Sequence, residues 1–310
     1  MPVFWKNKIL LAKIEAAYGT DAAPTGAANA VLATDVTLSP MEGNDVARNL
    51  DLPWFGSQGS VAVDLHAKLS FKVELAPSGT KGTPPAWGPL LRACGMAEVI
   101  VATTSVTYNP ISSGFESLSL HLWVGATQYK LSGARGTCTL RLGASAIPYL
   151  EFEFTGLFSQ PAEGARPTPT LTSWKAPRVA STLNTPTFTI AGTAMVLRSF
   201  ALAMGNAIEP RFLIGSESVL ITDHAETIEA TVEAVPLTTF NPYALAATGS
   251  TVAVSLVHGT TAGAIATIAA PAAQMQRPAG LENAQNIVEW PLRLVPTPTA
   301  GNDQWTLALT

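Results

Sequence analysis

Paired carboxylates are the first residues of this sequence that could do chemistry. Glu151 and Glu153 stand two positions apart in a segment of period two, so their side chains share one face of a predicted strand. Two acids placed across a sugar ring can hydrolyse a glycosidic bond. The same spacing also forms the ordinary polar face of a strand, and Glu226, Glu229 and Glu233 allow the same interpretation. We therefore expect neither set to be catalytic.

The histidines and cysteines show no spacing typical of a reactive or metal-binding site. His66 and His121 fall on the polar phase of alternating segments, and His258 precedes a glycine at a predicted turn. We expect these histidines to be solvated. Cys94 and Cys138 stand apart from any C-x-x-C pattern, which predicts two small, buried thiols.

Motifs for nucleotide binding or covalent catalysis are absent from the sequence. It contains no G-x-S-x-G, Walker or G-x-G-x-x-G pattern. Residues 133–136 (GARG) form a predicted turn between strands with no helix after it, so they cannot cradle a phosphate. The sequence predicts a protein that is not an enzyme and that has no cofactor and no metal.

The composition indicates an oligomer. Of 310 residues, 47% are apolar and only 13% are charged, against about a quarter charged in typical domains. A monomer with so few charges leaves apolar patches in water, and such patches usually mark partner surfaces. The 18 basic and 22 acidic residues give a net charge of −4. This balance excludes tight DNA binding but permits DNA to slide past.

The sequence gives no sign of export or membrane insertion. Lys6, Lys8 and Lys13 interrupt the only apolar stretch near the start, so no signal peptide is predicted. Residues 261–273 are too short and too weakly apolar to span a bilayer. We expect a protein that stays in the cytoplasm where it is made, without a membrane partner.

Most of the chain alternates apolar and polar residues, which predicts antiparallel strands with one face on a core. The alternation is clearest in residues 61–75, 118–124 and 150–154. Two short helices are predicted, near Trp87 and at residues 241–249, because Pro or Asn stands at each entry and Gly follows each end. The fold class is therefore mainly β.

The order of these elements repeats, which predicts two tandem antiparallel β-sandwich domains, each with one short flanking helix. Residues 37–44 (TLSPMEGN) are echoed by residues 200–206 (FALAMGN), and residues 150–154 by residues 288–292. An internal duplication explains both echoes, and convergence of two generic β-patterns is the alternative. We expect a first domain at 1–160 with an N-terminal arm and a long loop, a Pro- and Thr-rich linker at 161–186, and a second domain at 187–310.

Large aromatic residues stand near the start and end of the chain and in a polar loop, where they suit subunit contacts better than a monomer core. Each could instead fold back on its own domain. The predicted contact residues, with two charged neighbours, are Phe4, Trp5, Lys6, Asp51, Trp54, Phe55 and Trp305.

The start of the chain resembles phage tail tube proteins. Residues 3–6 (VFWK) and 12–20 (AKIEAAYGT) are similar to an extended arm followed by the E-x-x-Y/W-G-T turn of that family. The loop at 42–60 and the helix near Trp87 occupy the family's long-loop and flanking-helix positions. The resemblance covers residues 1–160 directly and the second half only through the duplication.

The resemblance implies a structural subunit of a long, non-contractile phage tail, located in the virion tail and assembled in the host cytoplasm. In that family six tail-tube domains close a ring around a lumen, and stacked rings form a tube for DNA ejection, with the long loop bridging rings. A duplicated chain then favours a trimer over a hexamer. The implied partners are other copies of the chain, tail tip and tail terminator proteins, a tape measure protein in the lumen, and DNA in non-specific transit.

One further interpretation belongs to a different class of protein. A β-sandwich adhesin or carbohydrate-binding module would have the same strand pattern. It would need exposed aromatic residues on one sheet face and usually an export signal, which the sequence does not show.

Overall fold

The computed structural model describes residues 3–310, and strands make up most of its regular structure. Its first half contains β1 (Lys8–Ile14), α1 (Gly26–Asn29), β2 (Ala30–Val31), β3 (Thr34–Ala47), β4 (Ser60–Glu74), α2 (Gly88–Arg92), β5 (Met96–Val101), β6 (Ser105–Pro110), β7 (Leu118–Val124), β8 (Thr127–Gly143), β9 (Tyr149–Phe158) and β10 (Ala162–Glu163). The mainly β, antiparallel fold class is confirmed.

The second half continues the same kind of structure. It contains β11 (Thr187–Ile190), β12 (Thr193–Ala194), β13 (Leu197–Ala203), β14 (Ala207–Leu213), β15 (Ser216–Asp223), β16 (Thr227–Glu233), α3 (Pro242–Thr248), β17 (Thr251–His258), β18 (Ala266–Met275), β19 (Glu282–Ala284), β20 (Ile287–Pro296) and β21 (Thr306–Leu309).

Alternation gives each central strand one core face and one polar face. In β4, Leu69, Phe71 and Val73 are buried while the residues between them are partly exposed. The neighbouring β9 places Phe152 and Phe154 opposite β4, and the three phenylalanine rings lie with centroids 5.7–5.9 Å apart. These rings form the centre of the core in the first half.

Strand pairing runs without interruption from the first half into the second. The order is β3–β4–β9–β8–β13–β16–β20, in which β8 pairs with β13 from Thr139↔Ala203 to Gly143↔Ser199. A second layer also joins the halves, because β21 pairs with both β6 and β18. Buried residues of both halves therefore form one hydrophobic cluster.

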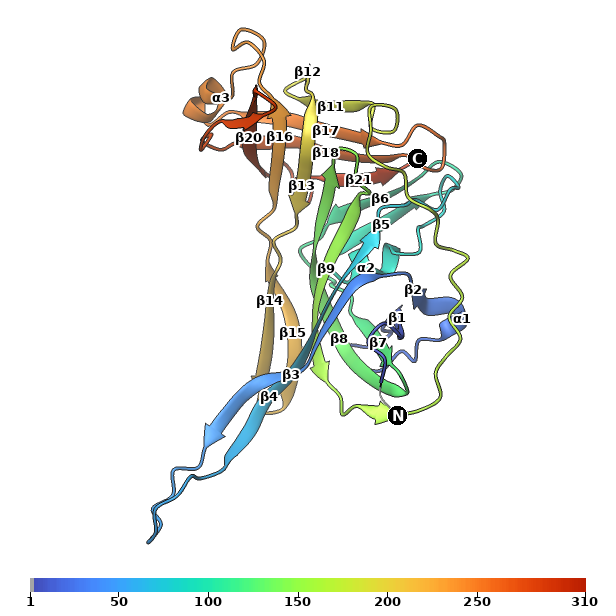
Figure 1. The fold of residues 1–310 in the computed structure, drawn as a ribbon, viewed down its shortest axis with the longest axis vertical. Coiled ribbons are helices and arrows are strands. Elements are labelled where there is room, and N and C mark those ends of the chain that lie inside the picture. The colour runs from blue at the N-terminus through green and yellow to red at the C-terminus, as the bar shows by residue number, and fades with distance from the viewer. Residues whose placement is uncertain (1–2) are drawn as a thin grey trace.

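Two long hairpins extend toward the same end of the molecule, opposite to β11 and β12 (Figure 1). The first is β3–β4 with its connecting loop, and the second is β14–β15. Alternation does not reveal β14, nor the break between the end of β15 at Asp223 and the start of β16 at Thr227. Pairing with β15, rather than burial of its own side chains, makes β14 a strand.

The predicted helices are present. In α3, the Asn241 side chain accepts a hydrogen bond from the Ala244 N–H at 3.0 Å, and Gly249 ends the helix with φ +64°. The helix near Trp87 is shorter than its signals suggested and spans Gly88–Arg92. In β20 the buried residues that alternate along the core face include Trp290, Leu292 and Leu294, while Val288 is exposed. The sequence echo aligned residues 150–154 with 288–292. The buried positions of β20 instead align residues 150–154 with 290–294.

The segment at residues 161–186 is packed along the first half. Trp174 donates a hydrogen bond from Nε1 to the Ala30 carbonyl at 2.9 Å, and the Thr170 N–H donates to the Gly26 carbonyl. Gly26 has no room for a side chain, because a Cβ would lie 2.3 Å from the Thr168 carbonyl oxygen. This segment therefore runs as a fixed strap over the first half (Figure 1).

The phenylalanine cluster predicts a large loss of stability on truncation. Phe154→Ala removes a fully buried ring, so we expect a loss of about 3–5 kcal/mol in the free energy of unfolding. Leu183→Ala, at a 77% exposed position, is the control and should change it by less than about 0.5 kcal/mol. Urea unfolding followed by circular dichroism measures both, and equal midpoints would contradict this description of the core.

Candidate functional site

The face of the continuous sheet that points away from the core carries charges that alternate from strand to strand. Lys72 on β4 lies 3.2 Å from carboxylate oxygens of both Asp35 and Glu151, and the Arg141 Nε donates to Glu151 at 2.7 Å. The series of charged residues runs across both halves as Asp35, Lys72, Glu151, Arg141, Glu229 and Arg293.

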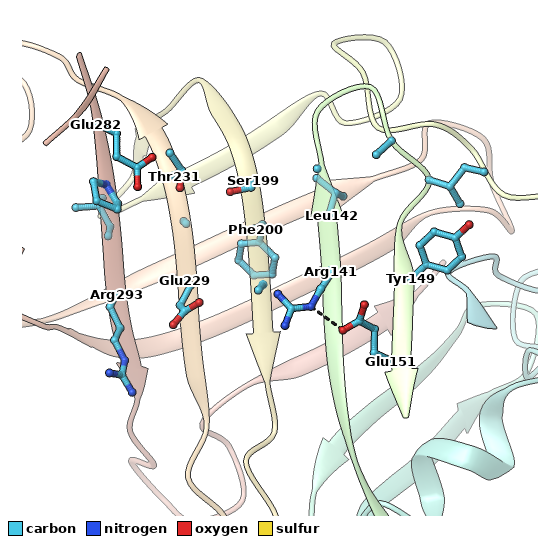
Figure 2. Close-up of a pocket in the computed structure, with 17 residues that line it drawn as sticks. Arg141, Leu142, Tyr149, Glu151, Ser199, Phe200, Glu229, Thr231, Glu282 and Arg293 are labelled. Carbon is cyan, nitrogen blue, oxygen red and sulfur yellow. Dashed lines mark hydrogen bonds and ion pairs between the residues drawn. The ribbon is translucent and has the colours of Figure 1, made fainter. Parts of the chain in front are cut away.

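A shallow hollow of about 750 Å³ lies on this charged face. Arg141 and Glu151 come from the first half, and Ser199, Glu229 and Arg293 from the second. Figure 2 shows these side chains standing side by side on neighbouring strands, with the Arg141–Glu151 ion pair at one side. Residues of both halves line the hollow, so the charged face continues across the junction between them.

Ion pairing holds Glu151 in its charged form. Partial burial opposes ionisation, but the hydrogen bonds from Arg141 and Lys72 outweigh it and lower the pKa of this carboxyl. A glycosidase acid needs the opposite shift, toward a raised pKa. Glu153 lies opposite Ser70 and Thr137 on the neighbouring strands. The expectation that this pair is structural agrees with the geometry.

The three more distant carboxylates occupy three different environments. Glu226 is buried and accepts a hydrogen bond from Gln304 at 2.8 Å, whereas Glu229 lies on the charged face. Glu233 is half-buried at the far end of β16, opposite Glu289. They do not converge on one point where a substrate could bind.

The prediction of solvated histidines is wrong for two of them. The side chain of His121 is buried because Asp21 covers it, with Nε2 2.9 Å from the Asp21 carboxylate. His258 is buried under the strap, with Nδ1 2.9 Å from the Thr185 hydroxyl. Burial lowers the pKa of both histidines. Strand alternation could not reveal these covering segments, since they come from distant parts of the sequence.

The two thiols are buried and free, as predicted, and burial raises the pKa of both Cys94 and Cys138. Within residues 3–310, no cluster of three or more His, Cys, Asp or Glu side chains could hold a metal ion. In the same part of the chain, no helix has the length and apolar character needed to cross a membrane.

Glu15 organises the turn that the sequence analysis singled out. Its buried carboxylate accepts hydrogen bonds from the Gly19 and Gly133 backbone N–H groups and from two serine hydroxyls, Ser117 and Ser119, at 2.7–2.9 Å. Such a fully satisfied buried network fixes the geometry of the turn.

The fixed turn positions Tyr18 toward the second half. The Tyr18 hydroxyl accepts a hydrogen bond from the Val219 N–H of β15 at 2.5 Å, and Arg135 stacks over the Tyr18 ring at 4.8 Å. Arg135 in turn donates to the Val219 carbonyl at 2.9 Å. The sequence motif therefore attaches the β14–β15 hairpin to the first half.

The β8–β13 junction contains a second group of contacts. The Met204 N–H donates to the Cys138 carbonyl at 3.0 Å, and the buried Asn206 amide donates to the carbonyls of Cys94 and Gly136 at 2.7 and 2.9 Å. Sequence reasoning noticed residues 200–206 as an echo, but it did not assign them a contact.

Most of the predicted contact residues are exposed. The exposed fractions are 70% for Phe4, 67% for Trp5, 68% for Trp54 and 107% for Phe55. Lys6 and Asp51 are also exposed. We call residues 40–63 of the β3–β4 hairpin the arm. It extends beyond the body of the molecule, and residues 50–55 form its tip (Figure 1).

Trp305 requires a correction. Its side chain is 2% exposed, because it stands directly before β21, the strand that lies between β6 and β18. It packs at the junction of the halves together with Met204 and Leu140. Trp305 thus packs within the single chain, against residues of the first half as well as of the second.

A long polar sheet face and exposed aromatic residues on an arm, without a convergent reactive site among the described residues, are typical of a structural protein. The model of the phage tail tube protein family matches residues 5–293, and the chain belongs to this family. No curated protein matches the chain. The protein is therefore a structural, non-enzymatic subunit of the tube in a phage virion tail. The match extends through both halves, beyond the 1–160 region that carried the resemblance directly.

The ion pairs of Glu151 predict a pH-dependent contribution to stability. A carboxyl with a lowered folded pKa stabilises the fold above its ordinary pKa of 4.5, and this contribution is lost as the pH falls through the folded value. We expect Glu151→Gln to cost about 0.5–1 kcal/mol at pH 7 and progressively less below pH 4.5. Urea unfolding from pH 7 to pH 2 measures this, with Glu153→Gln as control; a constant difference would contradict the assignment.

Proposed function

We propose that copies of this chain close into rings, that the rings stack into the tail tube, and that DNA leaves through the lumen. One observation supports this proposal above the others: strands of both halves form one continuous sheet with a polar face, β3–β4–β9–β8–β13–β16–β20. A sheet of this kind can curve into a wall whose polar side faces a water-filled channel.

The charges on that face suit a channel for DNA. In one row across it, three acidic and three basic residues alternate, namely Asp35, Lys72, Glu151, Arg141, Glu229 and Arg293, and the chain as a whole carries −4. DNA is held tightly where clustered Lys and Arg release its counterions. Alternating charges that neutralise one another, within a weakly acidic protein, leave the phosphates without such a cluster. The duplex then passes through without being retained.

The internal duplication favours three copies in each ring over six. In this proposal, residues 1–160 and 187–310 are two tail-tube-like domains joined by the strap at 161–186. Each chain would supply eight inner strand positions, the seven of β3–β4–β9–β8–β13–β16–β20 and the segment of β18 and β19 that pairs with the far side of β20. Three chains then give about 24 strands, which at ~4.8 Å spacing and ~40° tilt form a barrel with a backbone diameter of about 48 Å. Side chains leave about 38 Å, which admits a duplex about 20 Å wide together with water.

The tube position also defines the partners that we propose. Identical rings contact each other above and below, a tape measure protein occupies the lumen before DNA passes, and tail tip and tail terminator proteins close the two ends. The exposed arm and the aromatic residues Phe4 and Trp5 are the proposed contacts between rings, with Lys6 and Asp51 beside them.

The assembly itself is the direct test. Purified protein at increasing concentration should form rings and stacked tubes in negative-stain electron micrographs. Mass photometry of the smallest ring should give the mass of three 32.4-kDa chains. A mass of six chains would overturn the trimer, and a protein that stays monomeric at the highest concentration would overturn ring formation.

The arm tip should act in stacking and not in folding. Replacing Trp54 and Phe55 by Ser removes apolar surface that is exposed in the single chain, so the melting temperature should stay within about 1 °C. We expect tubes to shorten to single rings or short stacks. Ile100→Ser, at an exposed apolar position on β5, is the matched control. Tubes of unchanged length in the Trp54/Phe55 variant would remove the tip from the stacking contact.

A further inference from the structure

We propose that residues 41–44 of one copy dock on the second half of a neighbouring copy in the way that residues 204–206 dock on the first half of their own chain. This inference rests on the proposed ring and names the surface that closes it. It follows from a motif that occurs twice in the chain, as Met41-Glu42-Gly43-Asn44 and as Met204-Gly205-Asn206. One occurrence is buried, and the other is exposed.

The buried occurrence shows what the motif does. Met204 is 2% exposed and packs against Leu140 and Leu202 at the junction, while its N–H donates to the Cys138 carbonyl. Asn206 donates both of its amide hydrogens to first-half carbonyls, those of Cys94 and Gly136. The motif fastens the second half to the outer edge of β8.

The exposed occurrence lies within β3 and shares a close backbone approach at its glycine, but it makes none of the contacts of Met204 and Asn206. Met41 is 53% exposed, and the Asn44 amide donates a hydrogen bond to the exposed Asp64 carboxylate of the same hairpin at 3.1 Å. The two glycines share a constraint: a Cβ on Gly43 would lie 2.5 Å from the Val63 carbonyl oxygen, and one on Gly205 would lie 2.3 Å from the Ala225 carbonyl oxygen. Their φ angles differ, +156° at Gly43 and +61° at Gly205. What the two glycines share is a position where two backbone segments lie too close together for a side chain.

The strands that carry the motifs also hold equivalent positions. β13 pairs with β16 on one side and with β8 on the other. β3 pairs with β4, and among the described strands no second neighbour completes its other side. An edge strand of this length presents a row of unpaired backbone groups and tends to pair with another chain. β3 thus has a place for the neighbour that β13 finds in β8.

The surface on the neighbouring copy that receives β3 is the opposite edge of the same sheet, beyond β20. In the first half, Gly136 of β8 pairs opposite Phe154 of β9, and in the second half Met275 of β18 pairs opposite Leu294 of β20. The chain then continues along β20, where the Gln276 N–H donates to the Arg293 carbonyl at 2.8 Å. Residues 276–282 are partly or fully exposed. Beside β20 they hold the position that the part of β8 paired with β13 holds beside β9.

Charge contributes to this pairing. β3 has no Lys or Arg, and of its acids Asp35 and Glu42 pair with Lys72 and Lys68 of β4, which leaves Asp45 without an ion pair among the described residues. The edge that receives β3 presents Arg277, and Arg293 lies on the adjacent strand. The contact is head-to-tail, since different surfaces of the two copies meet, and repeating it generates a ring when the rotation closes.

Disulfide cross-linking tests the pairing. Met204 lies opposite Cys138, and Arg277 holds the position beside β20 that Cys138 holds beside β9. The repeat therefore places Met41 of one copy opposite Arg277 of its neighbour. The double variant Met41→Cys/Arg277→Cys should form a covalent ladder that ends at the closed ring on non-reducing gels, after mild oxidation of assembled protein. The native cysteines are buried and add little background. Each single variant, and Ile100→Cys/Arg277→Cys as a mismatched pair, should stay monomeric on the same gel.

The outcomes separate this inference from the proposed function. If rings form but Met41→Cys/Arg277→Cys gives no more cross-linking than the mismatched pair, the docking surface is wrong and the ring stands. If the unmodified protein forms no rings at any concentration, the proposed function fails first.

A matched pair of substitutions gives a second readout. Asn206→Ala acts within one chain, so it should lower the melting temperature of the monomer. Asn44→Ala should leave that temperature unchanged and raise the protein concentration needed for ring formation by about tenfold, the effect of losing one buried hydrogen-bonding group. An Asn44→Ala variant that forms rings at the same concentration as the unmodified protein would overturn the equivalence of the two asparagines.

Discussion

The backbone of an edge strand carries N–H and C=O groups that need partners, and the pairing of β8 with β13 meets this need at the centre of the molecule. This pairing turns two stretches of sheet into one and brings the buried faces of both halves into one hydrophobic cluster. The Tyr18–Val219 and Asn206–Gly136 hydrogen bonds are possible only because the two strands lie side by side. The polar face continues across the same junction.

The two faces of this sheet have different energetic roles. The core face excludes water with phenylalanine and leucine side chains, and it supplies most of the stability through apolar burial. On the other face the ion pairs around Glu151 are partly exposed and contribute little to folding. Their arrangement matters for what the surface does to a charged polymer, because each acid lies next to a base. Stability and surface chemistry are therefore carried by alternate residues of the same strands.

Sequence patterns predicted the strands with strong alternation and both short helices, because these depend on local residue order. They also pointed to the family through residues 12–20, although the role of Glu15 as the acceptor of four hydrogen bonds could not be foreseen. Patterns failed where contacts are distant: β14 exists through its partner strand, His121 and His258 are covered by remote segments, and Trp305 is enclosed by the second layer. Exposure of the arm was predictable, since its loop offers no apolar alternation.

The position of β21 has a consequence for the timing of folding. This strand, at residues 306–309, lies between β6 of the first half and β18 of the second, and it comes after every other strand in the chain. A chain emerges from the ribosome in sequence order, so β6 pairs early with β5, but its other side has no partner until nearly 200 later residues have been made. The second layer closes last, and with it the pocket around Trp305 and Met204. A nascent chain consequently lacks its finished junction, which delays the moment at which copies can join one another.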